Sequence, residues 1–166
     1  TKPGQRARVW MIVRPLPIEQ ATVRLLVADR RVSRADELAM HKSMNYLGRH
    51  LAYEEALVKG YDDAILLSPE GEVLETAHGN LFVNQRGEWI TPPAEGGLLA
   101  GTLRSALLQD SVLGATEREI TIDDLTSAEA VAVTNSVRGV QEVVEIASRH
   151  QRSIRSVQDL IDAAVR

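Results

Sequence analysis

The sequence predicts an α+β fold, in which a mixed or antiparallel sheet is combined with about three main helices. Two observations lead to this class. Short apolar segments rich in β-forming residues are separated by tight turns that contain Gly and Pro, and three longer segments carry apolar residues at helical spacing. The length of 166 residues, without an internal repeat or a linker, suits one domain with a substantial core.

The first third of the chain is expected to contain two strands and one helix. Residues 8–13 (RVWMIV) are apolar and β-forming, and prolines follow them, which end a strand because proline cannot donate to a sheet. Residues 21–28 predict a second strand, and the polar stretch 29–40 predicts a loop or an irregular helical turn. Residues 44–59 show helical spacing, and Gly60 follows where a helix C-cap favours glycine.

The middle of the chain predicts an antiparallel meander, because its strands are short and its turns are tight. The turn at residues 68–71 (SPEG) places Pro and Gly where β-turns favour them, and two prolines follow the last of these strands. The expected strands are residues 64–67, 72–75, 80–83 and 88–91.

The last part of the chain predicts two further helices and three strands. Residues 102–113 carry an apolar helical face, and Gly114 ends this helix. Residues 156–165 form an amphipathic pattern with Ser156 as the expected N-cap. The strands between the two helices are expected at residues 117–122, 130–134 and 140–146.

The composition excludes several classes of function. A net charge of -4 argues against nucleic-acid and acidic-membrane partners, because phosphate binding needs clustered positive charge. The absence of cysteine excludes disulfides, thiolate metal sites and a cysteine nucleophile, and the histidines lack the spacing of metal ligands. No apolar run approaches the roughly 20 residues that span a bilayer. No signal peptide is visible, so a cytoplasmic protein is expected.

Four separated segments carry side chains suited to chemistry. Lys42 precedes the long helix, and Glu75 lies at the end of a strand beside a loop of small residues. Residues 98–104 (LLAGTLR) lead into a helix N-terminus, whose free N–H groups and positive dipole end form a ready anion site. Residues 134–139 (TNSVRG) combine hydroxyl groups with a cation. Taken singly, these features have plain alternatives: a solvated lysine, a surface acid, a helix entry and a turn.

Taken in order, the segments resemble the class IV aminotransferase family, the pyridoxal-phosphate enzymes of fold type IV. The shared run is a lysine, two residues and an asparagine before a helix, then a glutamate-containing strand, NLFV, TPP, a Gly-Thr-Leu-Arg loop and the TNS segment. The resemblance extends from near residue 8 to the C-terminus and corresponds to the family's larger, C-terminal domain. It implies a barrel-like sheet, pyridoxal 5'-phosphate as cofactor and a small-molecule substrate with an amino group.

The resemblance also implies roles for individual residues. Lys42 matches the lysine that holds the cofactor covalently and then moves the proton on the substrate Cα. Glu75 matches the carboxylate that pairs with the pyridine nitrogen, and Tyr46 matches the tyrosine near the cofactor's 3-oxygen. The cofactor phosphate is expected on the amides of Thr102 and Leu103.

The TNS segment is expected to complete this site. Asn135 and Ser136 are assigned to the cofactor, with the Ser136 hydroxyl opposite the helix amides. Arg138 is a candidate for binding a substrate carboxylate through its guanidinium, and the alternative is a solvated turn arginine. Many family members carry Thr where this chain has Leu103, so a hydroxyl is missing while the amide remains.

Two details favour the lyase branch of the family. Two residues separate Lys42 from Asn45, as in D-amino acid aminotransferases and aminodeoxychorismate lyases, and the TNSVRGV run resembles that of the lyases. This resemblance implies the conversion of 4-amino-4-deoxychorismate to pyruvate and 4-aminobenzoate, a folate precursor. The alternatives are a branched-chain or D-amino acid transaminase, or a catalytically incomplete fragment of either enzyme.

The family's smaller N-terminal domain has no counterpart in this sequence. In the family, that domain supplies a phosphate-binding arginine and part of the substrate pocket. Residues 1–166 are therefore expected to form the cofactor-binding C-terminal domain alone, and the chain begins at Thr1 as if entered within a longer protein. The resemblance also implies a homodimer.

Overall fold

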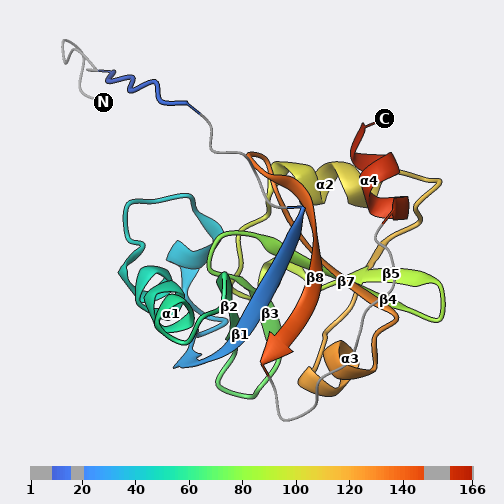
Figure 1. Cartoon of the computed structure of the whole chain (residues 1–166), viewed down its shortest axis with the longest axis horizontal. Helices are drawn as coiled ribbons and strands as arrows, with labels where there is room; N and C mark the ends of the chain where they lie inside the picture. Colours follow the sequence, from blue (N-terminus) through green and yellow to red (C-terminus); the bar gives the residue numbers. More distant parts are fainter. Residues whose placement is uncertain (1–8, 16–20, 148–157, 166) are drawn as a thin grey trace.

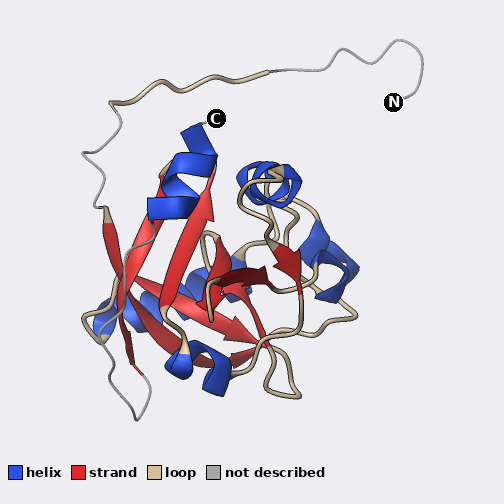
Figure 2. Cartoon of the chain, turned by 90° about the vertical axis from the view of Figure 1, so that its right-hand side faces the viewer, coloured by secondary structure: helices blue, strands red, loops and turns tan. Residues whose placement is uncertain are grey.

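The computed structural model describes residues 9–15, 21–147 and 158–165. Its strands are β1 (Thr22–Arg31), β2 (Asp63–Leu67), β3 (Val73–Thr76), β4 (Asn80–Gln85), β5 (Glu88–Thr91), β6 (Thr116–Glu117), β7 (Ala130–Asn135) and β8 (Gly139–Ala147). They form one eight-stranded sheet in the order β3-β2-β1-β8-β7-β4-β5-β6 (Figure 1). The sheet curls into a half-barrel, as Figure 2 shows from the side. The expected barrel-like α+β class is therefore confirmed.

The sheet mixes parallel and antiparallel pairs. β1 pairs in parallel with both β2 and β8, and β5 pairs in parallel with β6, whereas the other neighbours are antiparallel. A parallel pair needs a long crossover rather than a turn, and the helix between β1 and β2 provides it. β2, β4 and β7 are buried along nearly their whole length, which fits their continuous apolar runs.

The described ranges contain four α-helices around the sheet. They are α1 (Leu47–Val58), α2 (Thr102–Gln109), α3 (Ile122–Ser127) and α4 (Gln158–Val165), and short 3-10 turns occur at Glu37–Met40 and Ala94–Gly96. α1 packs on β1 and β2 through its buried face, where Ala52 and Ala56 meet Leu26 and Leu66. α2 and α4 lie side by side (Figure 1). None of these helices is both long enough and apolar enough to cross a bilayer.

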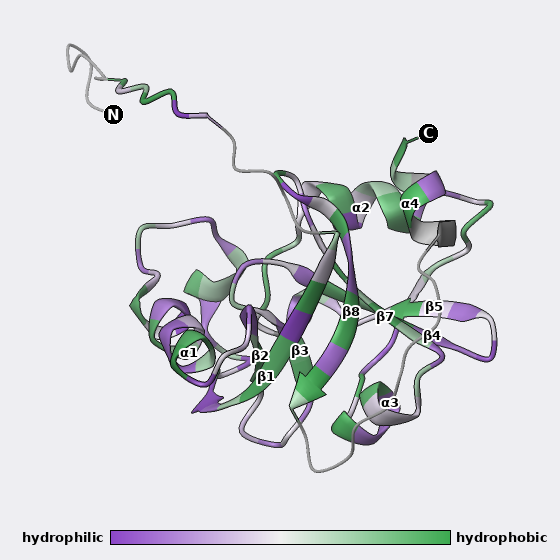
Figure 3. Ribbon diagram, in the orientation of Figure 1, coloured by the Kyte–Doolittle hydropathy of each residue, from purple (hydrophilic) through white to green (hydrophobic). Residues whose placement is uncertain are grey.

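The main core lies between strands that are distant in the sequence. Leu25 of β1, Ile65 of β2, Leu81 of β4 and Val131 of β7 are fully buried in one cluster. Along β1 and β8, buried and more exposed positions are interspersed, and Figure 3 shows hydrophobic and hydrophilic residues along both strands. This core fixes the strand ends that carry the candidate site residues.

The expected helices are present with shorter bounds. α1 begins at Leu47 rather than at residue 44, and α2 ends at Gln109 rather than at residue 113. α2 ends early because Asp110 Oδ1 accepts the amides of Val112 and Leu113, which forms a turn instead of another helical turn. The C-terminal helix is present as α4, and its expected N-cap, Ser156, lies outside the described residues.

The strand expected at residues 8–13 is wrong for the part of it that the structure describes. Residues 9–13 are in no strand (Figure 1). Their side chains are exposed, with Trp10 85% accessible. Apolar β-forming residues make a strand only when a sheet edge offers hydrogen-bond partners, and this segment leads away from the described sheet (Figure 2).

Two other expectations are also wrong. The strand expected at residues 117–122 is reduced to β6 and an isolated bridge at Ile120, because a helix with its own N-cap, α3, starts at Ile122. The meander is interrupted between β3 and β4, which are not neighbours in the sheet. β4 is buried on both faces between β5 and β7, a position that an edge strand such as β3 does not offer.

Candidate active site

One cavity of about 300 Å³ collects most of the residues that the sequence singles out. It lies where the start of α1, the end of β3, the start of α2 and the end of β7 meet. The expected site residues that line it are Lys42, Tyr46, Glu75, Thr102, Asn135 and Ser136. The sequence separations among them are large, so the sheet order rather than local sequence brings them together.

Lys42 and Tyr46 form one wall of the cavity. Lys42 Nζ lies 3.4 Å from the Tyr46 hydroxyl and 5.3 Å from the centroid of its ring. Tyr46 is the N-cap residue of α1, and Lys42 lies four positions earlier, in the exposed segment that leads to the helix. The packed helix thus fixes the tyrosine, and the tyrosine in turn holds the lysine amine at the cavity.

Glu75 places a buried carboxyl group in the wall of the cavity. Burial raises the pKa of Glu75 to about 7, against the opposing effects of the Arg49 guanidinium and the Leu99 amide. The Leu99 N–H donates to Oε1 at 3.2 Å, and the Asn80 side-chain amide donates to Oε2 at 3.4 Å. Contacts from α1, from the loop before α2 and from β4 therefore orient the carboxyl group. At neutral pH the group is close to balance between its protonated and ionised states.

Arg49 lines the cavity but is absent from the residues that the sequence singles out. Its Nη1 lies 2.5 Å from Glu75 Oε1, and its Cζ lies 5.9 Å from the Tyr46 ring centroid. The sequence does contain a signal for it, since Arg49 follows Tyr46 by three positions on α1 and residues so spaced share a helix face. Its partner on β3 could not be read from that spacing.

Asn80 and Gly79 are two further residues that sequence reasoning did not select. Asn80 Nδ2 donates to the Leu99 carbonyl at 2.8 Å, which ties the loop before α2 to the start of β4. Gly79 packs so closely against β7 that a Cβ there would lie 2.6 Å from Val133 Cγ1 and 2.8 Å from the Thr134 carbonyl oxygen. These contacts fix the loop before α2 and the end of β7 relative to the start of β4.

The start of α2 lies at the cavity rim. Its N-cap is Gly101, which provides no side-chain cap, and Thr102 lines the cavity. Leu103 directs its side chain into a hydrophobic cluster instead, so only its backbone remains as a candidate contact. Arg104 is buried and donates to the Pro92 carbonyl at 2.7 Å and to Glu117, which anchors the helix start to the sheet.

The end of β7 forms the opposite rim. Asn135 Oδ1 accepts the amides of Val137 and Arg138 at 3.0 and 2.7 Å, which builds the turn that follows. Ser136 lines the cavity, whereas the Arg138 side chain is exposed and is not among the lining residues. The buried Thr134 hydroxyl, also on this wall, has no hydrogen-bond partner among the described residues.

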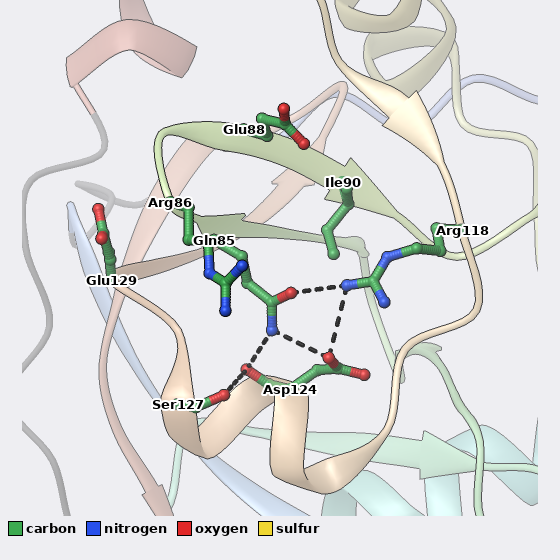
Figure 4. Close-up of a pocket in the computed structure, with 8 residues that line it drawn as sticks. All are labelled: Gln85, Arg86, Glu88, Ile90, Arg118, Asp124, Ser127 and Glu129. Carbon is green, nitrogen blue, oxygen red and sulfur yellow. Dashed lines mark hydrogen bonds and ion pairs between the residues drawn. The ribbon is translucent and has the colours of Figure 1, made fainter.

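A second and larger cavity, of about 700 Å³, lies beside the β4–β5 turn and α3 (Figure 4). Three of its polar side chains are bonded to one another: Arg118 Nη2 donates to Gln85 Oε1 at 2.6 Å and lies 3.4 Å from Asp124 Oδ1. Gln85 Nε2 completes the triangle with Asp124 at 3.0 Å (Figure 4). No residue expected in the site lines this cavity, so the smaller one is the better candidate for chemistry.

Comparison with known proteins identifies the family of enzymes to which this fold and cavity belong. A family model described as amino-transferase class IV matches residues 1–146. The chain therefore belongs to the class IV aminotransferase family, a family of enzymes that depend on pyridoxal phosphate.

Relatives described with different activities resemble the chain. A probable branched-chain-amino-acid aminotransferase of Aquifex aeolicus is 37% identical over 108 residues, which cover 63% of this chain and 35% of that protein. An aminodeoxychorismate lyase of Vibrio harveyi is 29% identical over 133 residues, 78% of this chain and 49% of the relative. The structure of a putative 4-amino-4-deoxychorismate lyase from Legionella pneumophila matches with a TM-score of 0.82 and 29% identity, covering 90% of this chain and 57% of the other. The chain thus spans half or less of these two curated relatives.

Proposed function

We propose that the chain forms the pyridoxal-phosphate site of a class IV enzyme that acts on the carbon bearing a substrate amino group. The observation that carries the proposal is the convergence of Lys42, Glu75 and the start of α2 on one cavity. Bound pyridoxal phosphate supplies an electron sink that makes a hydrogen on that carbon acidic.

Three features of the cavity suit a phosphorylated pyridine. Glu75 offers a carboxylate oxygen for a ring nitrogen. The start of α2 has no side-chain cap, so its amides are available for a phosphate. The buried Thr134 hydroxyl, unpartnered among the described residues, is a further polar group for a ligand to satisfy.

In this proposal, Lys42 holds the cofactor covalently and, once released from it, removes the proton from the amine-bearing carbon through Nζ. The Tyr46 hydroxyl, which lies 3.4 Å from Lys42 Nζ, positions this amine and contacts the cofactor's 3-oxygen. Glu75 accepts a hydrogen bond from the ring nitrogen. The amides of Thr102 and Leu103 and the Ser136 hydroxyl hold the phosphate, and Asn135 fixes the turn that carries Ser136.

The first candidate reaction is that of an aminodeoxychorismate lyase in folate biosynthesis. Lys42 would remove the proton at the amine-bearing carbon, the bond from the ring to the enolpyruvyl oxygen would break as the ring becomes aromatic 4-aminobenzoate, and the departing enolate would take up a proton to give pyruvate. The TNSVRGV segment and the lyases among the relatives support this candidate. Arg138, exposed on the turn after β7, would bind a substrate carboxylate.

The second candidate is an amino acid transaminase, which shares the proton removal by Lys42 and then releases an oxo acid. The Aquifex aeolicus relative, described as a probable branched-chain-amino-acid aminotransferase, favours it. The two candidates differ in product. Release of 4-aminobenzoate from 4-amino-4-deoxychorismate supports the first, and amino-group transfer between an amino acid and an oxo acid supports the second.

Replacement of the lysine tests the cofactor site. Full-length protein is mixed with pyridoxal phosphate, reduced with borohydride and digested, and the labelled peptide is identified by mass spectrometry. We expect the label on Lys42 and its loss in Lys42→Ala, because the amine that attaches the cofactor is gone. Lys59→Ala removes an exposed lysine at the far end of α1 and is expected to leave the label in place. A label that persists in Lys42→Ala would contradict the assignment.

In the same proposal the enzyme is a cytoplasmic homodimer. Met44, just before α1, and Leu47 and Leu51 in its first turns are exposed, and exposed apolar groups of this kind are typical of an interface. Light scattering of the full-length protein and cell fractionation check the two statements. A monomer at working concentration would exclude the dimer.

A further inference from the structure

Arg49 contacts Glu75, and the cofactor and substrate contacts proposed above do not involve Arg49. Its Nη1 lies 2.5 Å from Glu75 Oε1, and the two side chains are 13% and 5% exposed. Both residues also line the candidate active site. A charged pair in this position is costly to bury, and breaking a buried pair by removing one partner is strongly destabilising for the charge left behind.

The two oxygens of Glu75 are engaged unequally. Oε1 accepts both the Arg49 guanidinium and the Leu99 amide, at 2.5 and 3.2 Å. Among the described residues, the bond given for Oε2 is a long one from Asn80 Nδ2, at 3.4 Å. Since an ionised carboxylate accepts about four hydrogen bonds, Oε2 has the spare capacity. Arg49 therefore anchors the carboxylate by one oxygen and leaves the other for a ligand.

The charges around Glu75 make Arg49 its main ionic partner. Burial raises the pKa of Glu75, whereas Arg49 from α1 lowers it most and Arg104 from α2 lowers it less. Arg104 is committed to Glu117 and the Pro92 carbonyl. Lys42 and His78 line the same cavity, where Lys42 bonds to Tyr46 and His78 to Asp63.

We propose that Arg49 is a positioning residue that holds Glu75 by Oε1 and directs Oε2 toward the nitrogen of the cofactor ring, a role that rests on the proposed function of this cavity. Arg49 then acts on the cofactor only through Glu75. Its removal should weaken the binding of a ring that has the nitrogen, and spare a ring that lacks it.

The test compares two cofactors and three proteins. Wild type, Arg49→Gln and Arg49→Lys, all full-length, are titrated with pyridoxal phosphate and with the analogue in which carbon replaces the ring nitrogen. In parallel, NMR of carbon-labelled glutamate in the apoproteins gives the pKa of Glu75, assigned with Glu75→Gln. Arg118→Gln, which removes a half-exposed arginine at the second cavity, is the matched control and is expected to bind both cofactors as wild type does.

We expect Arg49→Gln to raise the pKa of Glu75 and to weaken pyridoxal phosphate binding by up to about tenfold for each unit of increase, because one pKa unit corresponds at most to a tenfold change in the ionised fraction. Binding of the analogue should not change, and Arg49→Lys, which keeps the charge, should restore part of the loss. Equal weakening for both cofactors, or an unchanged pKa of Glu75, would overturn the proposal. If wild type binds neither cofactor, the proposed function fails, while the apoprotein pKa still decides whether Arg49 controls Glu75.

Discussion

Glu75 makes the stability of this protein depend on pH in an unusual direction. Its pKa is raised by burial from the ordinary 4.5 to about 7, so the folded state retains a proton that the unfolded chain loses first. Between these two values the unfolded state binds fewer protons than the folded state. Stability therefore falls as the pH rises from 4.5 toward 7, and it stays level above that value.

Glu75→Gln should remove this dependence, because the amide does not titrate. Relative to the variant, wild-type apoprotein is expected to lose up to about 3 kcal/mol of unfolding free energy between the two pKa values. Urea unfolding at a series of pH values measures the difference, and groups that titrate equally in both proteins cancel. Asp62 and Glu117 have lowered pKa values, so their contributions disappear at lower pH, outside this window. A difference that is constant with pH would contradict the prediction.

Gly79 is required by close packing rather than by its backbone angles. A Cβ at this position would overlap the Val133 side chain and the Thr134 carbonyl of β7, and the backbone cannot move away easily because the Gly79 amide and carbonyl both bond to Thr76. Gly79→Ala should therefore destabilise the protein by about 1–3 kcal/mol, as overpacking does.

The same substitution at Gly48 is the matched control. A Cβ there meets nothing within 4 Å, and the residue lies within α1. Gly48→Ala should stabilise the protein by up to about 1 kcal/mol, because alanine favours a helix over glycine. Thermal or urea unfolding of both variants checks the pair, and a similar change in the two proteins would refute the packing argument.

At the scale of residues, much of the candidate site could be anticipated from the sequence. Lys42, Glu75 and Ser136 belong to an ordered series of segments, and such a series is visible without coordinates. Arg49 and Asn80 were not anticipated, because their significance comes from partners on other elements: Arg49 pairs with β3 and Asn80 with the loop before α2. The spacing of Arg49 after Tyr46 indicates a shared face, but it does not reveal that a buried carboxylate on β3 is the partner of this arginine.

At the scale of elements, α3 is a helix that the apolar pattern of the sequence does not predict. The helix has only six residues, too few for an apolar periodicity, and the alternation before it predicts a strand instead. Its start is nevertheless encoded by a capping box, in which Thr121 accepts the Asp124 amide and the Asp124 carboxylate accepts the Thr121 amide. The carboxylate also faces the second cavity (Figure 4).

Thr121→Ala should remove half of this box. The cap contributes about 1 kcal/mol, so the free energy of unfolding should fall by that amount in urea titrations. Ser111→Ala, at an exposed turn position, is expected to have little effect and serves as the control. A loss in both variants, or in neither, would show that the cap does not stabilise α3.

At the scale of the whole molecule, the class of fold was predictable but the order of the strands was not. Short apolar strands and three helical segments suffice for an α+β assignment. Whether β4 pairs with β3 or with β7 depends on which pairing buries more surface, and five residue pairs between β4 and β7 settle it in the folded state. Competition of this kind between distant segments leaves no local trace in the sequence.

The pairing of β1 with β8 has a consequence for how the protein is made. Thr22 to Leu26 of β1 lie beside Glu142 to Ala147 of β8 in the sheet. A nascent chain therefore carries Lys42 and Glu75 out of the ribosome well before the strand that completes β1 has been synthesised. Until then one edge of β1 is open to other chains. We expect the growing polypeptide to need protection by chaperones, and to acquire its binding cavity only when synthesis has passed residue 147.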